Sequence, residues 1–126
     1  MKQILSFLLF TAILLLINPG QSLAQCSESG ANFSCYSYSY DSESDTNSAT
    51  WITEGTLFWV FVSMKAEHPS DGFAFAEVTT PSDYWVNMVT DGDSYLDDFT
   101  MTGNFNSYLM LYSSARYGYS YVGASW

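Results

Sequence analysis

Two short stretches of the sequence alternate tyrosine with a small residue. Their six tyrosines are Tyr36, Tyr38 and Tyr40 in the first stretch, and Tyr117, Tyr119 and Tyr121 in the second. Side chains alternate between the two faces of a β-strand, so each set of three tyrosines is expected on one face, with the intervening small residues on the other. The two sets could then pair as a ladder of rings across one sheet.

A row of tyrosines has two further interpretations besides a structural ladder. Each side chain combines an apolar ring with a polar hydroxyl, so an exposed row can form a flat surface that stacks against a sugar ring or a protein partner. Alternating Tyr-Ser strands with few charges also do little to prevent strand edges from pairing, which would favour self-assembly. We expect Tyr36, Tyr38, Tyr40 and their C-terminal counterparts to be the ligand-binding residues.

The densest set of potential metal ligands lies between residues 91 and 98. Its four aspartates are Asp91, Asp93, Asp97 and Asp98. Ca²⁺ binds carboxylate and carbonyl oxygens, which an Asp-Gly-Asp loop supplies. An EF-hand is not expected, because no helical pattern flanks the loop. The segment therefore predicts either a calcium site in a loop between two strands or a solvated turn, for which Asp-Gly is also typical.

Groups suited to catalysis are scarce. His68 is the single histidine, and it precedes Pro69 in a stretch rich in turn residues. A Ser-His-Asp arrangement needs a base beside its nucleophile, and no Gly-x-Ser-x-Gly motif is present. A pair of acids could serve a glycosidase, but Asp97 and Asp98 would point to opposite faces of a strand. We expect a protein without enzymatic activity and without a cofactor, calcium excepted.

Residues 1–24 have the pattern of an export signal. Lys2 is followed by an apolar stretch at 4–17, a helix-breaking Asn-Pro-Gly, and small residues before a cleavage point at Gln25. The apolar stretch is shorter than the ~20 residues that span a bilayer. We expect a secreted, periplasmic or otherwise extracellular protein, with residues 25–126 as a single domain.

Cys26 and Cys35 are the two cysteines of the chain. An oxidising compartment favours their pairing as a disulfide. Their spacing matches neither a redox Cys-x-x-Cys motif nor a zinc site.

The overall composition excludes two classes of partner. The 126 residues contain 3 Lys and Arg against 13 Asp and Glu, for a net charge of −10. Nucleic-acid binding and adsorption to an anionic membrane both need basic residues, so neither is expected. A disordered acidic tail is also excluded, since 48% of the residues are hydrophobic and 18% aromatic.

Strand-like segments recur every 8–12 residues after the signal. They are rich in aromatic and β-branched residues and are separated by Gly, Pro, Asp and Asn. These segments are 33–40, 50–53, 56–64, 73–79, 84–90, 96–102, 106–113 and 117–121. The pattern predicts an all-β fold, a small antiparallel β-sandwich of about eight short strands with a jelly-roll or immunoglobulin-like topology.

The positions of the core and of one loop can also be predicted. Residues 56–62 are apolar on both faces of a strand, which indicates a central strand covered on both sides. The rings expected in the core are Phe58, Trp59, Phe61, Phe73 and Phe75. Residues 41–49 are polar and acidic, and are expected to form an exposed loop.

The favoured function is that of a secreted binding or adhesion module without catalytic activity. Its ligand would be a carbohydrate or an extracellular protein, bound through exposed Tyr and Trp side chains with or without calcium. A small outer-membrane β-barrel is the first alternative, because export and aromatic period-two strands fit that class. A self-assembling extracellular structural protein is the second. The oligomeric state is not encoded in any motif.

Overall fold

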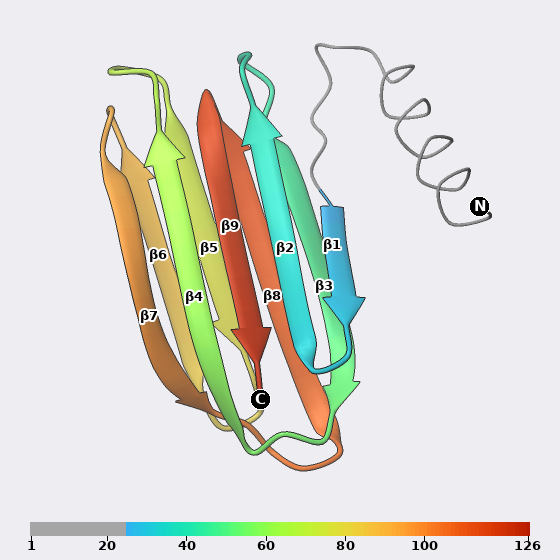
Figure 1. Cartoon of the computed structure of the whole chain (residues 1–126). Coiled ribbons are helices and arrows are strands. Elements are labelled where there is room, and N and C mark those ends of the chain that lie inside the picture. Colours follow the sequence, from blue (N-terminus) through green and yellow to red (C-terminus); the bar gives the residue numbers. More distant parts are fainter. Residues whose placement is uncertain (1–24) are drawn as a thin grey trace, which may run out of the picture.

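The computed structural model describes residues 25–126, and the predicted export signal at 1–24 lies outside the described residues. Nine strands form two antiparallel sheets packed face to face (Figure 1). The strands are β1 (Gln25–Ser29), β2 (Asn32–Ser39), β3 (Asp45–Thr53), β4 (Leu57–Ala66), β5 (Phe73–Thr79), β6 (Tyr84–Thr90), β7 (Ser94–Thr102), β8 (Ser107–Arg116) and β9 (Gly118–Ser125). No helix within this range is long and apolar enough to cross a membrane.

The strand order is that of a jelly roll with one added strand. The five-stranded sheet has the order β1-β2-β9-β4-β7, and the four-stranded sheet has the order β3-β8-β5-β6. The chain moves from one sheet to the other at nearly every connection, and only β1–β2 and β5–β6 are hairpins within a sheet. This confirms the predicted antiparallel β-sandwich and selects the jelly-roll topology for β2–β9.

Two strands differ from the predicted segments. Strand β1 lies before the first of them, and β3 begins at Asp45, so the second half of the predicted 41–49 loop is paired with β8. Residues 45–52 alternate half-buried and exposed positions, because β3 lies at the edge of its sheet. An edge strand needs fewer apolar residues than a central one, so its polar composition resembled that of a loop.

The predicted disulfide joins directly opposed residues of β1 and β2. Cys26 and Cys35 are register partners, with an S–S distance of 2.03 Å and a Cα–Cα distance of 4.0 Å. A turn at Gly30 connects the two strands, and its positive φ of 60° suits glycine. The bond therefore fixes the edge strand β1 to the sandwich.

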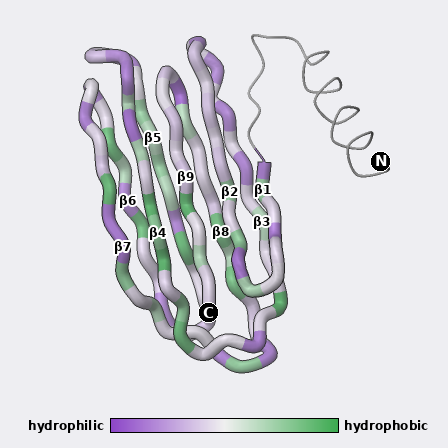
Figure 2. Tube along the Cα trace, viewed as in Figure 1, coloured by the Kyte–Doolittle hydropathy of each residue, from purple (hydrophilic) through white to green (hydrophobic). Residues whose placement is uncertain are grey.

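Small and aliphatic side chains dominate the space between the sheets. Buried positions alternate with more exposed ones along strands such as β2, β4 and β5, as expected when one face of each strand is buried. Figure 2 shows hydrophobic residues along much of β4. The buried hydrophobic cluster consists of Phe33, Cys35, Phe58, Val60, Val62, Met64, Ala74, Ala76, Val78, Met101, Leu109, Leu111, Val122 and Ala124. Only two members of this cluster are aromatic.

Four of the five rings expected in the core lie elsewhere. Phe58 is fully buried, but Trp59 and Phe61 are exposed on the outer face of the five-stranded sheet. Phe73 and Phe75 are half-buried on the outer face of the four-stranded sheet, while Ala74 and Ala76 between them are buried. Strand β4 is therefore interior in its sheet, as its neighbours β9 and β7 show, but it is covered on one side only.

Candidate functional site

The outer face of the five-stranded sheet carries four of the six tyrosines expected to bind a ligand, each of them half-buried. Strand β2 contributes Tyr36 and Tyr38, and β9 contributes Tyr119 and Tyr121. Strand β4 adds Trp59 and Phe61 beside them. We call the surface formed by these six residues the platform face.

Sheet register pairs the tyrosines of β2 and β9 directly. Tyr36 is the partner of Tyr121, and Tyr38 is the partner of Tyr119. Along β2 the rings of Tyr36 and Tyr38 stack, with centroids 6.3 Å apart and planes 15° apart. The cross-strand pairing predicted from the sequence is therefore present for four of the six tyrosines.

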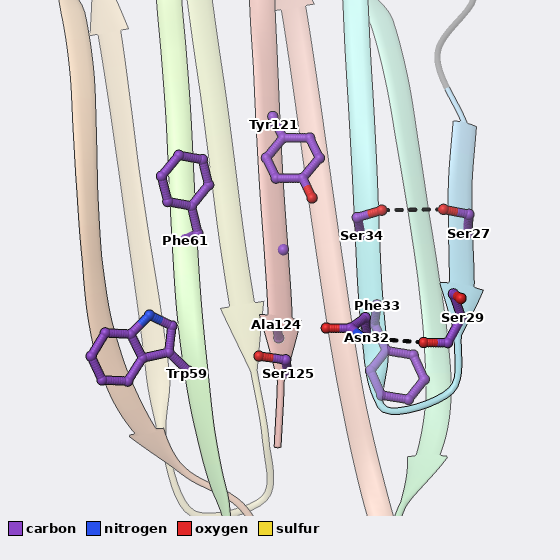
Figure 3. A pocket seen from close by; sticks show the side chains of 11 residues that line it. Ser27, Ser29, Asn32, Phe33, Ser34, Trp59, Phe61, Tyr121, Ala124 and Ser125 are labelled. Carbon is purple, nitrogen blue, oxygen red and sulfur yellow. Dashed lines mark hydrogen bonds between the residues drawn. The ribbon is translucent and has the colours of Figure 1, made fainter.

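A shallow hollow of about 210 Å³ lies on the platform face. Figure 3 shows Trp59 and Phe61 from β4 on one side of it, and Ser34 and Asn32 from β2 on the other. Gly123 of β9 also lines the hollow, and a Cβ added there would lie 2.9 Å from the Tyr121 hydroxyl oxygen. A side chain at this position would therefore displace the Tyr121 ring and fill part of the hollow.

The aromatic side of the hollow was missed by sequence reasoning. Trp59 is 55% exposed and Phe61 is 42% exposed, although residues 56–62 are apolar at every position but Thr56. The alternation continues as Ser63 and Lys65 on the same face, and a lysine is almost never buried without a partner. Lys65 was therefore the signal that this face of β4 is open to solvent.

Polar groups are concentrated on the opposite side of the hollow. The hydroxyls of Ser27 and Ser34 are hydrogen-bonded at 3.2 Å, and the Asn32 side-chain amide donates to the Ser29 carbonyl at 3.3 Å. Ser125 of β9 also lines the hollow. Aromatic rings thus face hydroxyl and amide groups across one depression, an arrangement suited to a ligand that is apolar on one side and polar at its edges.

The Tyr36 phenol on the platform face remains neutral at physiological pH. Partial burial raises the pKa of Tyr36, and the neighbouring groups Tyr119, Tyr40, Glu67 and Asp45 raise it further. A neutral phenol donates a hydrogen bond and adds no charge to the surface.

Tyr40 and Tyr117 lie beyond the four paired tyrosines, at one end of the sandwich. They line a separate pocket of about 170 Å³ together with Glu67, His68 and Pro69. Tyr117 has a positive φ of 47° and its ring lies 5.0 Å from that of His68. The six tyrosines proposed as one binding set are therefore divided between two places, although the rings of Tyr38 and Tyr40 are in contact at 4.6 Å.

His68 is held in its turn by backbone contacts. Its Nδ1 accepts hydrogen bonds from the backbone amides of Ser70 and Asp71, both at 3.2 Å. The ring is thus fixed with Nδ1 as an acceptor, and it helps to shape the loop between β4 and β5.

The four aspartates proposed as calcium ligands are not brought together. Asp91 and Asp93 lie in the turn between β6 and β7, while Asp97 and Asp98 lie within β7. Asp97 accepts a hydrogen bond from the Tyr95 hydroxyl at 3.0 Å. Within residues 25–126, no three His, Cys, Asp or Glu side chains form a group that could hold a metal ion.

No family profile matches the chain, and no curated protein matches it. One solved structure is described as "CBM4 structure and function". Its alignment covers 85% of this chain and 77% of the matched chain, with 11% sequence identity and a TM-score of 0.36.

Proposed function

We propose that this protein is an exported, non-catalytic carbohydrate-binding module, and that its ligand is a neutral glycan bound on the platform face. The observation that carries the proposal is the exposure of Trp59 and Phe61 beside a hollow whose other side is formed by Asn32 and Ser34. A sugar ring has an apolar face of C–H groups and a polar rim of hydroxyls. The two sides of the hollow complement these two parts of a sugar.

The charge of the protein favours a neutral ligand over an acidic one. The chain has a net charge of −10, and Lys65 is the basic residue of β4 on this side of the sheet. An acidic glycan such as a polyuronate would be repelled by the protein as a whole.

Export is part of the proposal, and the Cys26–Cys35 disulfide supports it, since such bonds persist in oxidising compartments. An exported protein would have access to polysaccharides and glycoproteins outside the cell. The sandwich also presents the platform face on a continuous sheet of five strands, which holds the rings in fixed positions.

Binding to soluble oligosaccharides tests the proposal. Isothermal titration with neutral hexasaccharides of glucose, xylose, mannose and galactose is compared with titration of oligogalacturonate. We expect binding to at least one neutral sugar and none to the acidic one. Trp59→Ala and Phe61→Ala should each weaken binding by about five- to a hundredfold, since a ring that stacks on a ligand typically contributes about 1–3 kcal/mol.

Phe105→Ala is the matched control, because Phe105 is an exposed ring in the turn between β7 and β8, away from the hollow. It should leave binding unchanged. Failure of every neutral sugar in titration and on a glycan array would overturn the proposal. Capture of an extracellular protein that depends on Trp59 would show that the platform face binds protein instead.

A further inference from the structure

We propose that the outer face of the four-stranded sheet binds a second copy of this chain, forming a face-to-face dimer with two-fold symmetry. This face is formed by the outward side chains of β3, β8, β5 and β6, and we call it the four-strand face. It is on the side of the sandwich opposite the platform face, so the inference is independent of the proposed function.

The four-strand face is unusually apolar for a surface open to solvent. Five of its large hydrophobic side chains are at least 40% exposed: Ile52, Tyr84, Val86, Met88 and Tyr108. Phe75 and Tyr112 lie among them in edge-to-face contact, with ring centroids 5.5 Å apart. Contiguous apolar surface of this kind marks an interaction site in soluble proteins.

Two opposite charges on this face indicate what covers it. Glu77 of β5 and Arg116 of β8 are both half-buried. Glu77 is the register partner of Tyr112, and Arg116 is the register partner of Phe73. Four residues along a strand therefore separate them, about 13 Å, which is too far for an ion pair within one chain.

The contacts that these charges make in the described chain are with neutral groups. The guanidinium of Arg116 lies 5.1 Å from the centre of the Phe73 ring, and its Nε donates to the Asp71 carbonyl at 3.0 Å. The Glu77 carboxylate accepts from the Thr79 hydroxyl at 3.3 Å. The terminal amino groups of Arg116 remain available for a carboxylate from outside the chain.

A two-fold axis would supply that carboxylate. Phe75 and Ser114, themselves register partners, lie midway between Glu77 and Arg116. An axis in the plane of the face, crossing the strands at this level, places Glu77 of each copy opposite Arg116 of the other. Two ion pairs then flank a central contact between the Phe75 rings, and the same surface serves both copies, as a two-fold interface requires.

The size of the face indicates a weak, reversible dimer. Four strands about 4.8 Å apart and some eight residues long cover roughly 500 Å². Stable complexes bury about 800 Å² on each partner, so association is expected at micromolar rather than nanomolar concentration. The net charge of −10 on each copy also opposes association, and this repulsion is screened at physiological salt.

Sedimentation equilibrium of the secreted protein from about 1 μM to 1 mM in 0.15 M NaCl tests the proposal. The wild-type protein should dimerise. Glu77→Arg and Arg116→Glu, each alone, should weaken dimerisation at least tenfold, because each places like charges opposite one another. The double variant with both changes should recover it, since the pair is restored with its charges exchanged.

Two further variants separate this interface from others. Met88→Lys introduces a charge at an exposed position of the four-strand face and should abolish dimerisation, whereas Trp59→Ala on the platform face should leave it unchanged. Circular dichroism checks that each variant is folded. A monomer up to 1 mM, or a dimer that tolerates both Met88→Lys and the single charge reversals, would overturn the proposal. If Trp59→Ala loses sugar binding but still dimerises, the platform face binds sugar and the four-strand face binds the second copy independently.

Discussion

Ser37 of β2 donates a hydrogen bond to the backbone carbonyl of Ser113 of β8, 2.9 Å away in the opposite sheet. Both side chains are fully buried, and their hydroxyls are also hydrogen-bonded to each other. Ser120 of β9 makes a similar bond to the Phe75 carbonyl at 2.7 Å. The serines of the Tyr-Ser strands therefore face the interior and connect the two sheets, while the tyrosines face outward.

Replacing Ser37 with alanine should lower the free energy of unfolding by about 1–2 kcal/mol, because a buried bond between the sheets is lost and its partner groups are left in an apolar setting. Urea unfolding measures the change. Ser34→Ala in the same strand is the control, since Ser34 lies on the outer side and should change stability by no more than about 0.5 kcal/mol. Equal losses in the two variants would contradict a role for Ser37 between the sheets.

Most of the strands, and the pairing of the two tyrosine rows in one sheet, followed from local sequence features. Alternation at Tyr36, Tyr38, Tyr119 and Tyr121 fixed which residues share a face, and turn residues marked most strand ends. This information is local, because side-chain direction repeats every two residues. The register that makes Tyr36 the partner of Tyr121 did not follow from the alternation, because a shift of two residues leaves the same side chains on the same face.

Which face would be buried did not follow from ring size. Ring size predicts Trp59, Phe61, Phe73 and Phe75 inside, yet the inward-facing neighbours of these rings along β4 and β5 include smaller residues such as Val60 and Ala74. The charged residues that continue each alternation, Lys65 in β4 and Glu77 in β5, identify the outer face better than hydrophobicity does. The hollow itself depends on strands far apart in sequence, which no local pattern specifies.

Thr53 offers a case in which removing a polar group should stabilise the protein. Its side chain is fully buried, and its hydroxyl has no hydrogen-bond partner within the described chain. Thr53→Val replaces that hydroxyl with a methyl group of similar size and should raise the free energy of unfolding by about 1 kcal/mol. Thermal and urea unfolding of the variant provide the measurement.

Thr80→Val is the matched control for that substitution. The Thr80 hydroxyl is also buried, but it donates to the Thr102 carbonyl at 2.7 Å. The same chemical change should therefore cost about 1 kcal/mol at this position. A loss of stability at Thr53 equal to that at Thr80 would show that the Thr53 hydroxyl has a partner in solution.

The disulfide between Cys26 and Cys35 should stabilise the protein by about 2–3 kcal/mol, because it closes a short loop in the unfolded chain. The double variant with alanine at both positions should unfold at correspondingly lower urea concentration. The jelly-roll strands β2–β9 should still form, since β1 lies at the edge of its sheet. Reductant should destabilise the wild-type protein and leave the variant unaffected, and an equal response of the two would contradict the prediction.

Stability should fall at alkaline pH partly through Tyr36. Its pKa is raised above the ordinary value of 10.0, chiefly by burial, so folding favours the protonated phenol. This contribution is complete below pH 10 and is lost as the pH rises through the higher pKa of the folded state. Near pH 7, the free energy of unfolding of Tyr36→Phe should depend on pH in the same way as that of the wild-type protein. Above pH 10, the variant should lose less stability than the wild-type protein. Parallel urea midpoints across this range would refute the assignment.

Gly123→Ala should separate binding from stability. The added Cβ would lie 2.9 Å from the Tyr121 hydroxyl, at the free end of a side chain that can shift, so stability should change by less than about 1 kcal/mol. The hollow would become shallower, and affinity for a neutral oligosaccharide should fall about tenfold in titration. At Gly118 the same substitution would place its Cβ 2.1 Å from the Lys65 carbonyl oxygen, which the sheet holds in place. Gly118→Ala should therefore cost about 2–3 kcal/mol in urea unfolding. Undiminished sugar binding by a folded Gly123→Ala protein would place the ligand outside the hollow.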